Sequence, residues 1–138
     1  MSDDINYETP LEVAERNGCV IDMRFGYEPK WLYILFWPEL QMVKIGLTKH
    51  KYINRDDNIR QRIRCICRNE KLDFPAIVFS TGGTFRHEHE IREKLKEFQI
   101  HNRKDWFHLD RKSKRMINEI LEYFDKHDSL GQFPRLLN

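Results

Sequence analysis

Short apolar runs along the chain predict β-strands. Trp31–Trp37 contains only aromatic and aliphatic side chains, which is typical of a buried strand. Met42–Leu47 is a second, mainly apolar run, and Pro38-Glu39 before it favours a turn, so the two runs predict a hairpin. Ala76–Ser80 predicts a third strand, which Thr81-Gly82-Gly83 is expected to end.

Apolar residues at helical spacing predict two helices within and after this region. The first is expected over Ile59–Arg68, with Asp57 or Asn58 as its N-cap. The second is expected to follow Thr84 as its N-cap and to carry Glu88 in its first turns. Its apolar stripe consists of residues spaced four and three apart: Ile91, Leu95 and Phe98.

The remaining patterned segments complete the predicted fold. Thr9 and Pro10 are typical of a helix start, and this short helix is expected to end at Arg16. Trp106–Leu109 predicts a short extended segment, and a final helix is expected to begin at Ser113. The order of elements predicts an α+β domain with a small, mainly antiparallel three-stranded sheet flanked by helices.

Charge is distributed unevenly along the chain, whose formal net charge is only +2. Residues 1–30 carry seven acids and three bases, whereas residues 31–83 carry nine bases and five acids. We therefore interpret residues 1–30 as an acidic N-terminal extension, 31–127 as the folded domain and 128–138 as a C-terminal tail. The basic central region suits a phosphate ligand, although a randomly uneven surface would give the same pattern.

The cysteines and the apolar content limit the expected location of the protein. Cys19, Cys65 and Cys67 are odd in number, and they match neither a disulfide framework nor a zinc site. Reduced thiols in the cytoplasm are the simplest interpretation. The acidic N-terminus does not resemble a signal peptide, and no apolar run is long enough for a membrane span. A cytoplasmic protein without membrane association is expected.

Four side chains with chemistry suited to a phosphodiester fall within the predicted elements. Tyr33 lies in the first strand, Lys44 precedes Gly46 in the second, Arg62 lies in the first helix and Glu88 in the next. Each has an ordinary interpretation when it is considered alone, as a packed aromatic residue or a solvated charge. Their order along the chain is more informative than any one of them.

Five short motifs in this order resemble the GIY-YIG nuclease superfamily. They are similar to those of short phage and bacterial members whose second motif reads Lys-Ile-Gly. The motifs are Leu32-Tyr33-Ile34-Leu35, Val43-Lys44-Ile45-Gly46-Leu47-Thr48, Arg62-Ile63 with Ile66, Glu88 with Ile91, Arg92 and Leu95, and Asp105-Trp106-Phe107. The resemblance spans roughly residues 31–110. It implies a phage-related, metal-dependent endonuclease that hydrolyses nucleic acid phosphodiester bonds, with DNA favoured over RNA.

The resemblance also implies roles for the four residues. Glu88 would bind one divalent ion, Mg²⁺ or Mn²⁺, that stabilises the leaving 3′ oxygen, and Arg62 would donate two parallel hydrogen bonds to the phosphate. Tyr33 would accept a proton from the attacking water. An ionised phenol costs roughly 4 kcal/mol at pH 7, and an ammonium such as Lys44 about 4 Å away supplies a similar amount. Whether Tyr33 or Lys44 accepts the proton stays open.

Other residues are expected to support this site. Gly46, Trp106 and Phe107 are structural parts of the motifs, and Trp106 and Phe107 are expected to close the core over the sheet, with base stacking as the alternative. The cations expected to bind the nucleic acid backbone are Arg55, Arg60, Arg64, Arg68 and Lys49. The loop between Gly46 and Arg62 is longer than in the family, so Arg55 is the alternative to Arg62.

Two other functions are compatible with the sequence. The chain could be a non-catalytic nucleic-acid-binding module that uses Arg60–Arg68 and Arg111–Arg115. It could also be a protein-interaction domain whose acidic N-terminal extension docks on a basic partner or covers its own basic face. The sequence shows no separate recognition domain, so strong site specificity would require the tails or a homodimer.

Overall fold

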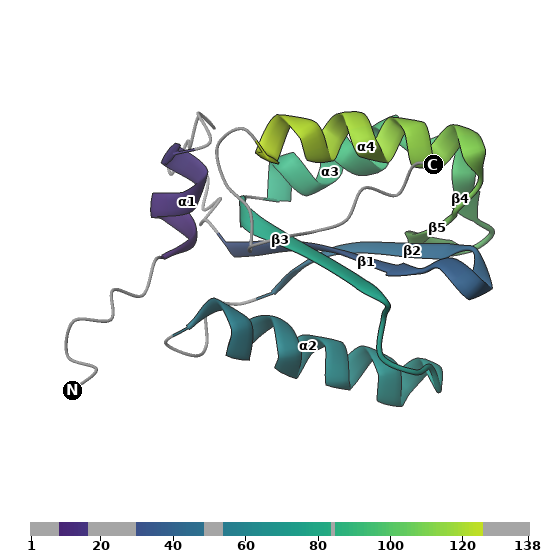
Figure 1. The fold of residues 1–138 in the computed structure, drawn as a ribbon, viewed down its shortest axis with the longest axis horizontal. Helices are drawn as coiled ribbons and strands as arrows, with labels where there is room; N and C mark the ends of the chain where they lie inside the picture. The colour runs from purple at the N-terminus through teal and green to yellow at the C-terminus, as the bar shows by residue number, and fades with distance from the viewer. Residues whose placement is uncertain (1–8, 17–29, 49–53, 84, 126–138) are drawn as a thin grey trace.

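The computed structural model describes residues 9–16, 30–48, 54–83 and 85–125, without the side chains of 121–125. It is an α+β fold around a five-stranded antiparallel sheet, in the order β3-β1-β2-β5-β4 (Figure 1). The strands are β1 Lys30–Trp37, β2 Met42–Thr48, β3 Ile77–Gly83, β4 Gln99–Ile100 and β5 Arg103–His108. The α+β class is as predicted, but the predicted count of three strands was wrong.

The two extra strands come from a polar segment. β4 and β5 form a tight hairpin in which Asn102 adopts a left-handed conformation with φ of 62°. Apart from Ile100 and the last residues of β5, this segment lacks the alternation of apolar residues that indicates a strand. Its pairing with β2, rather than its own composition, makes it part of the sheet.

Helices cover both faces of the sheet (Figure 1). The helices are α1 Pro10–Arg16, α2 Arg55–Glu70, α3 Phe85–Lys94 and α4 Arg111–Asp125, with short 3₁₀ helices η3 Pro38–Leu40 and η4 Lys96–Phe98. α2 lies on one face, and α3 and α4 lie on the other. None of the helices in the described part of the chain is long and apolar enough to cross a membrane.

Strand β1 contributes to the core on both faces. Leu32, Ile34 and Phe36 pack with apolar residues of α3 and α4, whereas Tyr33 and Leu35 pack with those of α2. Because alternate side chains of a strand point to opposite faces, a strand buried on both sides has no polar alternation. This explains the unbroken apolar run in the sequence.

The start of α2 differs from the prediction. The helix begins at Arg55, and the side chain of Asn54 caps it by accepting a hydrogen bond of 2.7 Å from the backbone N–H of Asp57. The predicted caps, Asp57 and Asn58, were therefore wrong, because both lie inside the first turn. The helix gains one turn at its N-terminus, and this turn places Arg55 against the sheet.

The ends of α3 and α4 also differ from the predicted ones. α3 ends at Lys94, and the predicted apolar stripe continues into η4 through Leu95 and Phe98, which are buried as expected. α4 begins before Ser113, because Asp110 accepts a 2.8 Å hydrogen bond from the backbone N–H of Ser113. Thr84, the predicted cap of α3, lies outside the described residues.

Helix α1 packs directly on the sheet. Thr9 accepts a hydrogen bond from the backbone of Glu12, as expected for an N-cap, and Val13 and Ala14 are fully buried. Strand β3 was expected to end at Ser80, but it continues to Gly83 because Thr81, Gly82 and Gly83 pair with β1. A Cβ atom at Gly82 would overlap with the backbone carbonyl of Pro10. The glycine therefore allows α1 to approach β3 closely.

Candidate active site

The first two motif residues meet across the hairpin. Tyr33 of β1 and Gly46 of β2 are direct partners in the antiparallel register. A Cβ atom at Gly46 would overlap with the phenol oxygen of Tyr33, so the ring lies across the glycine. The Tyr33 residue is only 1% exposed. The missing side chain at position 46 therefore sets the position of the Tyr33 hydroxyl.

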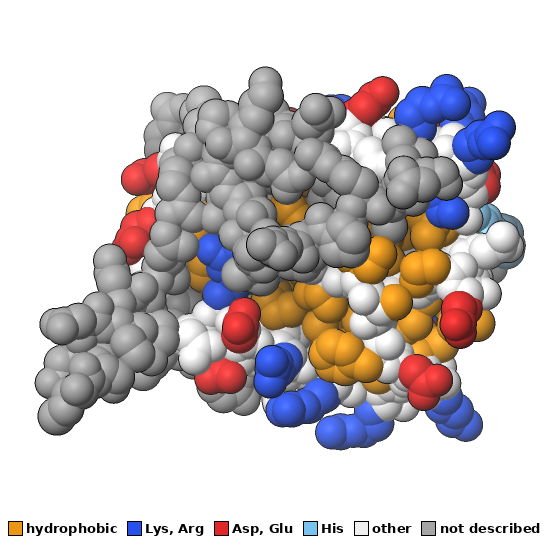
Figure 2. Space-filling model, viewed as in Figure 1, with side chains coloured by type: hydrophobic (Ala, Val, Ile, Leu, Met, Phe, Trp, Pro, Cys, Tyr) orange, Lys and Arg blue, Asp and Glu red, His pale blue; other side chains and the backbone are white. Residues whose placement is uncertain are grey.

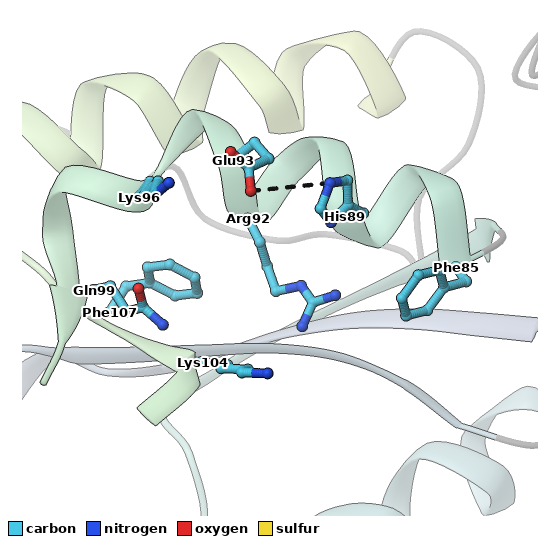
Figure 3. Close-up of a pocket in the computed structure, with 8 residues that line it drawn as sticks. All are labelled: Phe85, His89, Arg92, Glu93, Lys96, Gln99, Lys104 and Phe107. Carbon is cyan, nitrogen blue, oxygen red and sulfur yellow. Dashed lines mark ion pairs between the residues drawn. The ribbon is translucent and has the colours of Figure 1, made fainter. Parts of the chain in front are cut away.

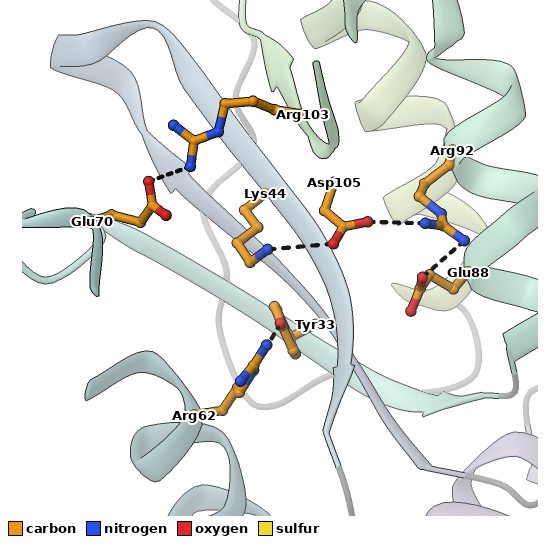
Figure 4. Close-up of polar contacts among 8 residues, drawn as sticks. All are labelled: Tyr33, Lys44, Arg62, Glu70, Glu88, Arg92, Arg103 and Asp105. Atoms are coloured by element: carbon orange, nitrogen blue, oxygen red, sulfur yellow. Dashed lines mark hydrogen bonds and ion pairs between the residues drawn. The ribbon is translucent and has the colours of Figure 1, made fainter. Parts of the chain in front are cut away.

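Arg62 of α2 contacts this hydroxyl. Its Nε donates a hydrogen bond of 3.3 Å to the Tyr33 oxygen (Figure 4). Burial raises the pKa of the Tyr33 phenol, and the hydrogen bond and charge of Arg62 oppose that rise without cancelling it. Negative charge from Asp105 and Glu88 raises the same pKa further. Tyr33 is therefore held as a neutral phenol at neutral pH.

Lys44 lies on the α2 face of β2 but is not the cation next to the phenol. Its ammonium is 3.7 Å from a carboxylate oxygen of Asp105 and 5.1 Å from the ring centre of Trp106. Burial lowers the pKa of Lys44, Asp105 opposes that change, and the charge of Arg62 adds to it. The expectation that Lys44 stabilises an ionised Tyr33 is thus not supported by a direct contact, because Arg62 is the cation hydrogen-bonded to the Tyr33 hydroxyl.

Glu88 of α3 is connected to the other predicted site residues through Arg92 and Asp105. Arg92, one turn along the helix, is 3.1 Å from Glu88 Oε1 through its NH2 group and 2.9 Å from Asp105 Oδ1 through its NH1 group. Glu88 is 7% exposed. Burial raises the pKa of its carboxyl group, Arg92 opposes the rise and Asp105 adds to it. Arg92 therefore links the metal-ligand candidate to the Lys44–Asp105 ion pair.

These residues gather where β5 separates from β2. In the described register, β5 pairs with β2 only over Met42–Lys44, so the rest of β2 has β1 alone as its neighbour. α2 approaches this place from one face and α3 from the other (Figure 1). In Figure 4, Tyr33 and Lys44 lie on one side of β2 and Glu88 lies on the other, and Asp105 lies between Lys44 and Arg92. An Arg103–Glu70 ion pair lies at the far end of the group.

Most of the predicted backbone-binding cations lie on the outer face of α2. Arg60, Arg64 and Arg68 are exposed, and Lys and Arg side chains line this edge of the molecule (Figure 2). Arg55 differs, because it is 9% exposed, donates a hydrogen bond to the Ser80 carbonyl and lies 4.5 Å from the ring centre of Trp31. Arg55 therefore contributes to packing within the fold, and we no longer count it among the cations expected to bind the nucleic acid backbone. Lys49 lies outside the described residues.

The closing motif has a packing role. Trp106 and Phe107 are 5% and 1% exposed, and the Trp106 ring centre is 5.3 Å from that of Trp37. The prediction that these residues close the core is confirmed, and neither ring is available for base stacking. The histidines on either side of Glu88 differ in position, since His89 is exposed beside Glu93 whereas His87 is half-buried. Cys65 and Cys67 are free thiols.

The donor set suits a sparsely ligated metal ion. Among the described residues, no group of three or more His, Cys, Asp or Glu side chains could hold a metal ion. Mg²⁺ commonly keeps several waters and binds one or two carboxylates together with substrate phosphate oxygens. Glu88, with Asp105 on the same arginine, fits that requirement.

Two members of the site were named in the sequence motifs without a role. Arg92 stands four residues after Glu88, a spacing that brings opposite charges together on a helix, so the pair could have been predicted. The position of Asp105 depends on the β4–β5 hairpin and could not have been predicted.

No protein-family model matches the chain, and no curated protein or solved structure matches it either.

Proposed function

We propose that the chain is a metal-dependent endonuclease of the GIY-YIG type that hydrolyses nucleic acid phosphodiester bonds, with DNA favoured over RNA. One observation carries this proposal: a phenol hydrogen-bonded to Arg62 and a carboxylate paired with Arg92 lie on either side of β2, connected by the ion pairs that Asp105 makes with Lys44 and Arg92. Two cations, a carboxylate and a hydroxyl are the groups that phosphodiester hydrolysis requires.

Arg62 and Tyr33 would bind and orient the reacting groups. Arg62 is on the exposed side of α2 and uses only its Nε on Tyr33 among the described residues, so its two terminal nitrogens can bind a phosphate oxygen pair. The neutral Tyr33 hydroxyl can accept a hydrogen bond from the attacking water while Arg62 stays in contact with it. Tyr33 thus positions the water against the phosphate that Arg62 holds.

The directions of the two pKa shifts favour Lys44 as the proton acceptor. A neutral phenol accepts no proton at neutral pH, and burial moves Tyr33 away from ionisation. Burial moves Lys44 toward its neutral amine, which is a competent base. In this mechanism Lys44 takes the proton of the attacking water, and the adjacent Asp105 stabilises the ammonium that forms.

Glu88 would hold the divalent ion, Mg²⁺ or Mn²⁺. A divalent ion held by Glu88 would supply positive charge to the phosphate and to the leaving 3′ oxygen. The carboxylate is engaged by Arg92 in the structure, so ion binding requires that this contact be shared or released. Asp105 remains within ion-pair distance of Arg92 and can keep that guanidinium charge paired when Glu88 turns to another ligand.

Cleavage of supercoiled plasmid tests the proposal directly. The wild-type protein is incubated with Mg²⁺, Mn²⁺ or EDTA, next to Glu88→Ala and to Glu90→Ala, which removes an exposed carboxylate two residues away. We expect nicked and linear product with either ion, none with EDTA or Glu88→Ala, and normal product with Glu90→Ala. Absence of metal-dependent cleavage by the wild-type protein would reject the enzyme.

A non-catalytic nucleic-acid-binding module is the second candidate. The exposed arginines along α2, Arg60, Arg64 and Arg68, favour it, because such a row can neutralise successive phosphates whether or not cleavage occurs. Salt-dependent binding of the wild-type protein without any cleavage would identify this function. Cleavage that Glu88→Ala abolishes would exclude it.

A further inference from the structure

A pocket of about 510 Å³ opens beside the candidate active site, between α3 and the β4–β5 hairpin (Figure 3). Its walls carry Phe85 and Arg92 from α3, Lys96 from η4, Gln99 from β4 and Lys104 from β5. The buried ring of Phe107 contributes apolar surface. A volume of this size falls within the range of small-molecule sites, roughly 300–1,000 Å³.

One end of the pocket carries two lysines, and the acidic residue of the lining, Glu93, has its carboxylate 3.9 Å from His89 Nε2. Lys96 and Lys104 have no carboxylate within ion-pair distance among the described residues, and they approach the pocket from two different elements. The Gln99 amide lies beside them, and it too has no hydrogen-bond partner in the described part of the chain. Two ammonium groups and an amide N–H are suitable donors for a phosphate.

The other end presents an aromatic ring to solvent. Phe85 is 52% exposed, and its ring stacks on His89 with an interplanar angle of 17° and a centroid distance of 6.4 Å. The Arg92 guanidinium lies 5.6 Å from the Phe85 ring centre. Exposed aromatic rings beside cations are the platforms on which unpaired bases stack.

Arg92 joins the pocket to the active site. The same guanidinium that lines the pocket holds Glu88 and Asp105. In Figure 3 it lies between the Phe85 end and the end with Lys96 and Lys104. A nucleic acid strand bound at Glu88 would therefore share Arg92 with the ligand of the pocket.

We infer that this pocket binds one unpaired nucleotide of the nucleic acid strand, next to the phosphate at Glu88. Its base stacks on Phe85, and the following phosphate is held by Lys96, Lys104 and the Gln99 amide. The inference rests on the proposed function for the choice of a nucleic acid strand as the ligand. It adds that the preferred substrate has a single-stranded or opened segment beside the cleaved bond.

Binding can be measured separately from cleavage. Fluorescence anisotropy with a labelled oligothymidylate of roughly 10 nucleotides is recorded in EDTA over a series of salt concentrations. The double variant Lys96→Ala/Lys104→Ala is compared with Lys71→Asn/Lys94→Ala, which removes the same charge from exposed positions outside the pocket. Phe85→Ala is compared with Phe74→Ala, another exposed phenylalanine.

The two pairs of variants have distinct expected results. Loss of both pocket lysines should weaken binding about tenfold or more and reduce the magnitude of the salt slope by about 0.7 for the lost phosphate contact. Phe85→Ala should weaken binding roughly 5- to 150-fold with an unchanged salt slope. The two control variants should bind the oligonucleotide within about twofold of the wild-type protein, since surface changes away from contacts are nearly neutral.

The outcomes separate this inference from the enzyme itself. The inference is overturned if the pocket variants bind like their controls, even if plasmid cleavage depends on Glu88. It is also overturned if a fully paired duplex displaces the labelled oligothymidylate more readily than an unlabelled single strand does. Pocket variants that lose binding, in a protein that never cleaves, would support the nucleotide site and reject the endonuclease. Competition by thymidine 5′-phosphate alone, at concentrations at which the unlabelled strand does not compete, would overturn the role of a continuous strand.

Discussion

The phenol of Tyr33 lies directly across Gly46 on the neighbouring strand, in the one place where a side chain would displace it. Gly46→Ala should therefore move the hydroxyl away from Arg62. We expect cleavage to fall at least about tenfold, because small displacements of a positioned group reduce rates strongly. Overpacking of this kind typically destabilises by about 1–3 kcal/mol. Plasmid cleavage and urea unfolding measure the two effects.

Gly83→Ala is the matched control for this change. A Cβ atom there would lie 3.5 Å from the Leu32 Cβ, which is ordinary van der Waals contact. Gly83→Ala should leave both cleavage and stability close to wild type. If Gly46→Ala cleaves as well as Gly83→Ala does, the position of the Tyr33 hydroxyl is not important for the reaction.

The proton acceptor can be identified from the pH dependence of cleavage. If Lys44 acts as a neutral amine, the rate should rise with pH up to a pKa below 10.5, because burial lowers the pKa of this residue. Lys44→Arg keeps the charge but releases no proton, so the rising limb should disappear with a loss of roughly 10²–10⁴ in rate. Single-turnover rates from pH 6 to 10 provide the measurement.

Variants at Tyr33 and Lys44 give the contrasting result. Tyr33→Phe keeps the ring and should reduce the rate while preserving the rising limb, since the phenol only orients the water. If Lys44→Arg or Lys44→Met retains the wild-type pH profile and Tyr33→Phe removes it, the tyrosine is the base and Lys44 has no part in proton transfer.

Glu88 should reduce stability at neutral pH. Burial raises its pKa above the ordinary value of 4.5, so folding favours the protonated form. The stabilising contribution of this group is complete below the unfolded pKa and is lost as the pH rises through the folded pKa. Glu88→Gln should therefore be more stable than the wild-type protein at pH 7, with a difference that disappears below about pH 4.

Urea unfolding of both proteins at pH 7 and pH 4 measures this difference. Glu90→Gln, which changes an exposed carboxylate on the same helix, should show no comparable gain at pH 7. A Glu88→Gln protein that is less stable than wild type at pH 7 would mean that the Arg92 ion pair outweighs the effect of burial.

Helix α1 provides a test that concerns the fold rather than the chemistry. Gly82→Ala would place a Cβ atom against the Pro10 carbonyl and push α1 away from β3. We expect a loss of about 1–3 kcal/mol and nearly unchanged cleavage by the protein that remains folded. The midpoint of thermal unfolding, compared with that of Gly83→Ala, measures the effect. An unchanged midpoint would mean that α1 contributes little to stability.

The packing of α1 also affects the idea that the N-terminal extension covers a basic face. Removing residues 1–28 would remove α1, whose Val13 and Ala14 are buried in the core. A truncated protein would then lose packing as well as acidic residues. The charge of the extension is better tested by neutralising Glu12, which does not touch the buried face of α1.

The sequence predicts the parts of this fold whose composition is locally consistent. The hairpin of β1 and β2, helix α2 and the cap at Thr9 follow from apolar runs, helical spacing and a capping hydroxyl. β4 and the first half of β5 were missed because their sequence is polar and their place in the sheet depends on pairing with β2, whereas the end of β5 falls in the predicted extended segment Trp106–Leu109. The predicted β3 was too short because Gly82 and Gly83 are typical of a break, whereas here both pair with β1 and Gly82 allows the close approach of α1.

In the site, too, local features were predictable from the sequence and long-range contacts were not. Tyr33 and Gly46 fall in register because a short hairpin fixes their pairing, and the i, i+4 spacing of Glu88 and Arg92 is visible in the sequence. The partners of Arg62 and Lys44 could not be predicted. Arg62 rather than Lys44 contacts the phenol, and Lys44 is paired with Asp105, because these contacts depend on how α2 and the β4–β5 hairpin sit on the sheet.

Arg92 also bears on the protein before any ion or substrate arrives. Two carboxylates brought together in a partly buried place would repel each other, and the guanidinium between them removes the need for a divalent ion to keep them there. The chain can thus complete its tertiary structure in a chelator, with Glu88 already in position. Metal would then enter as a late component of the working complex rather than as a requirement for folding.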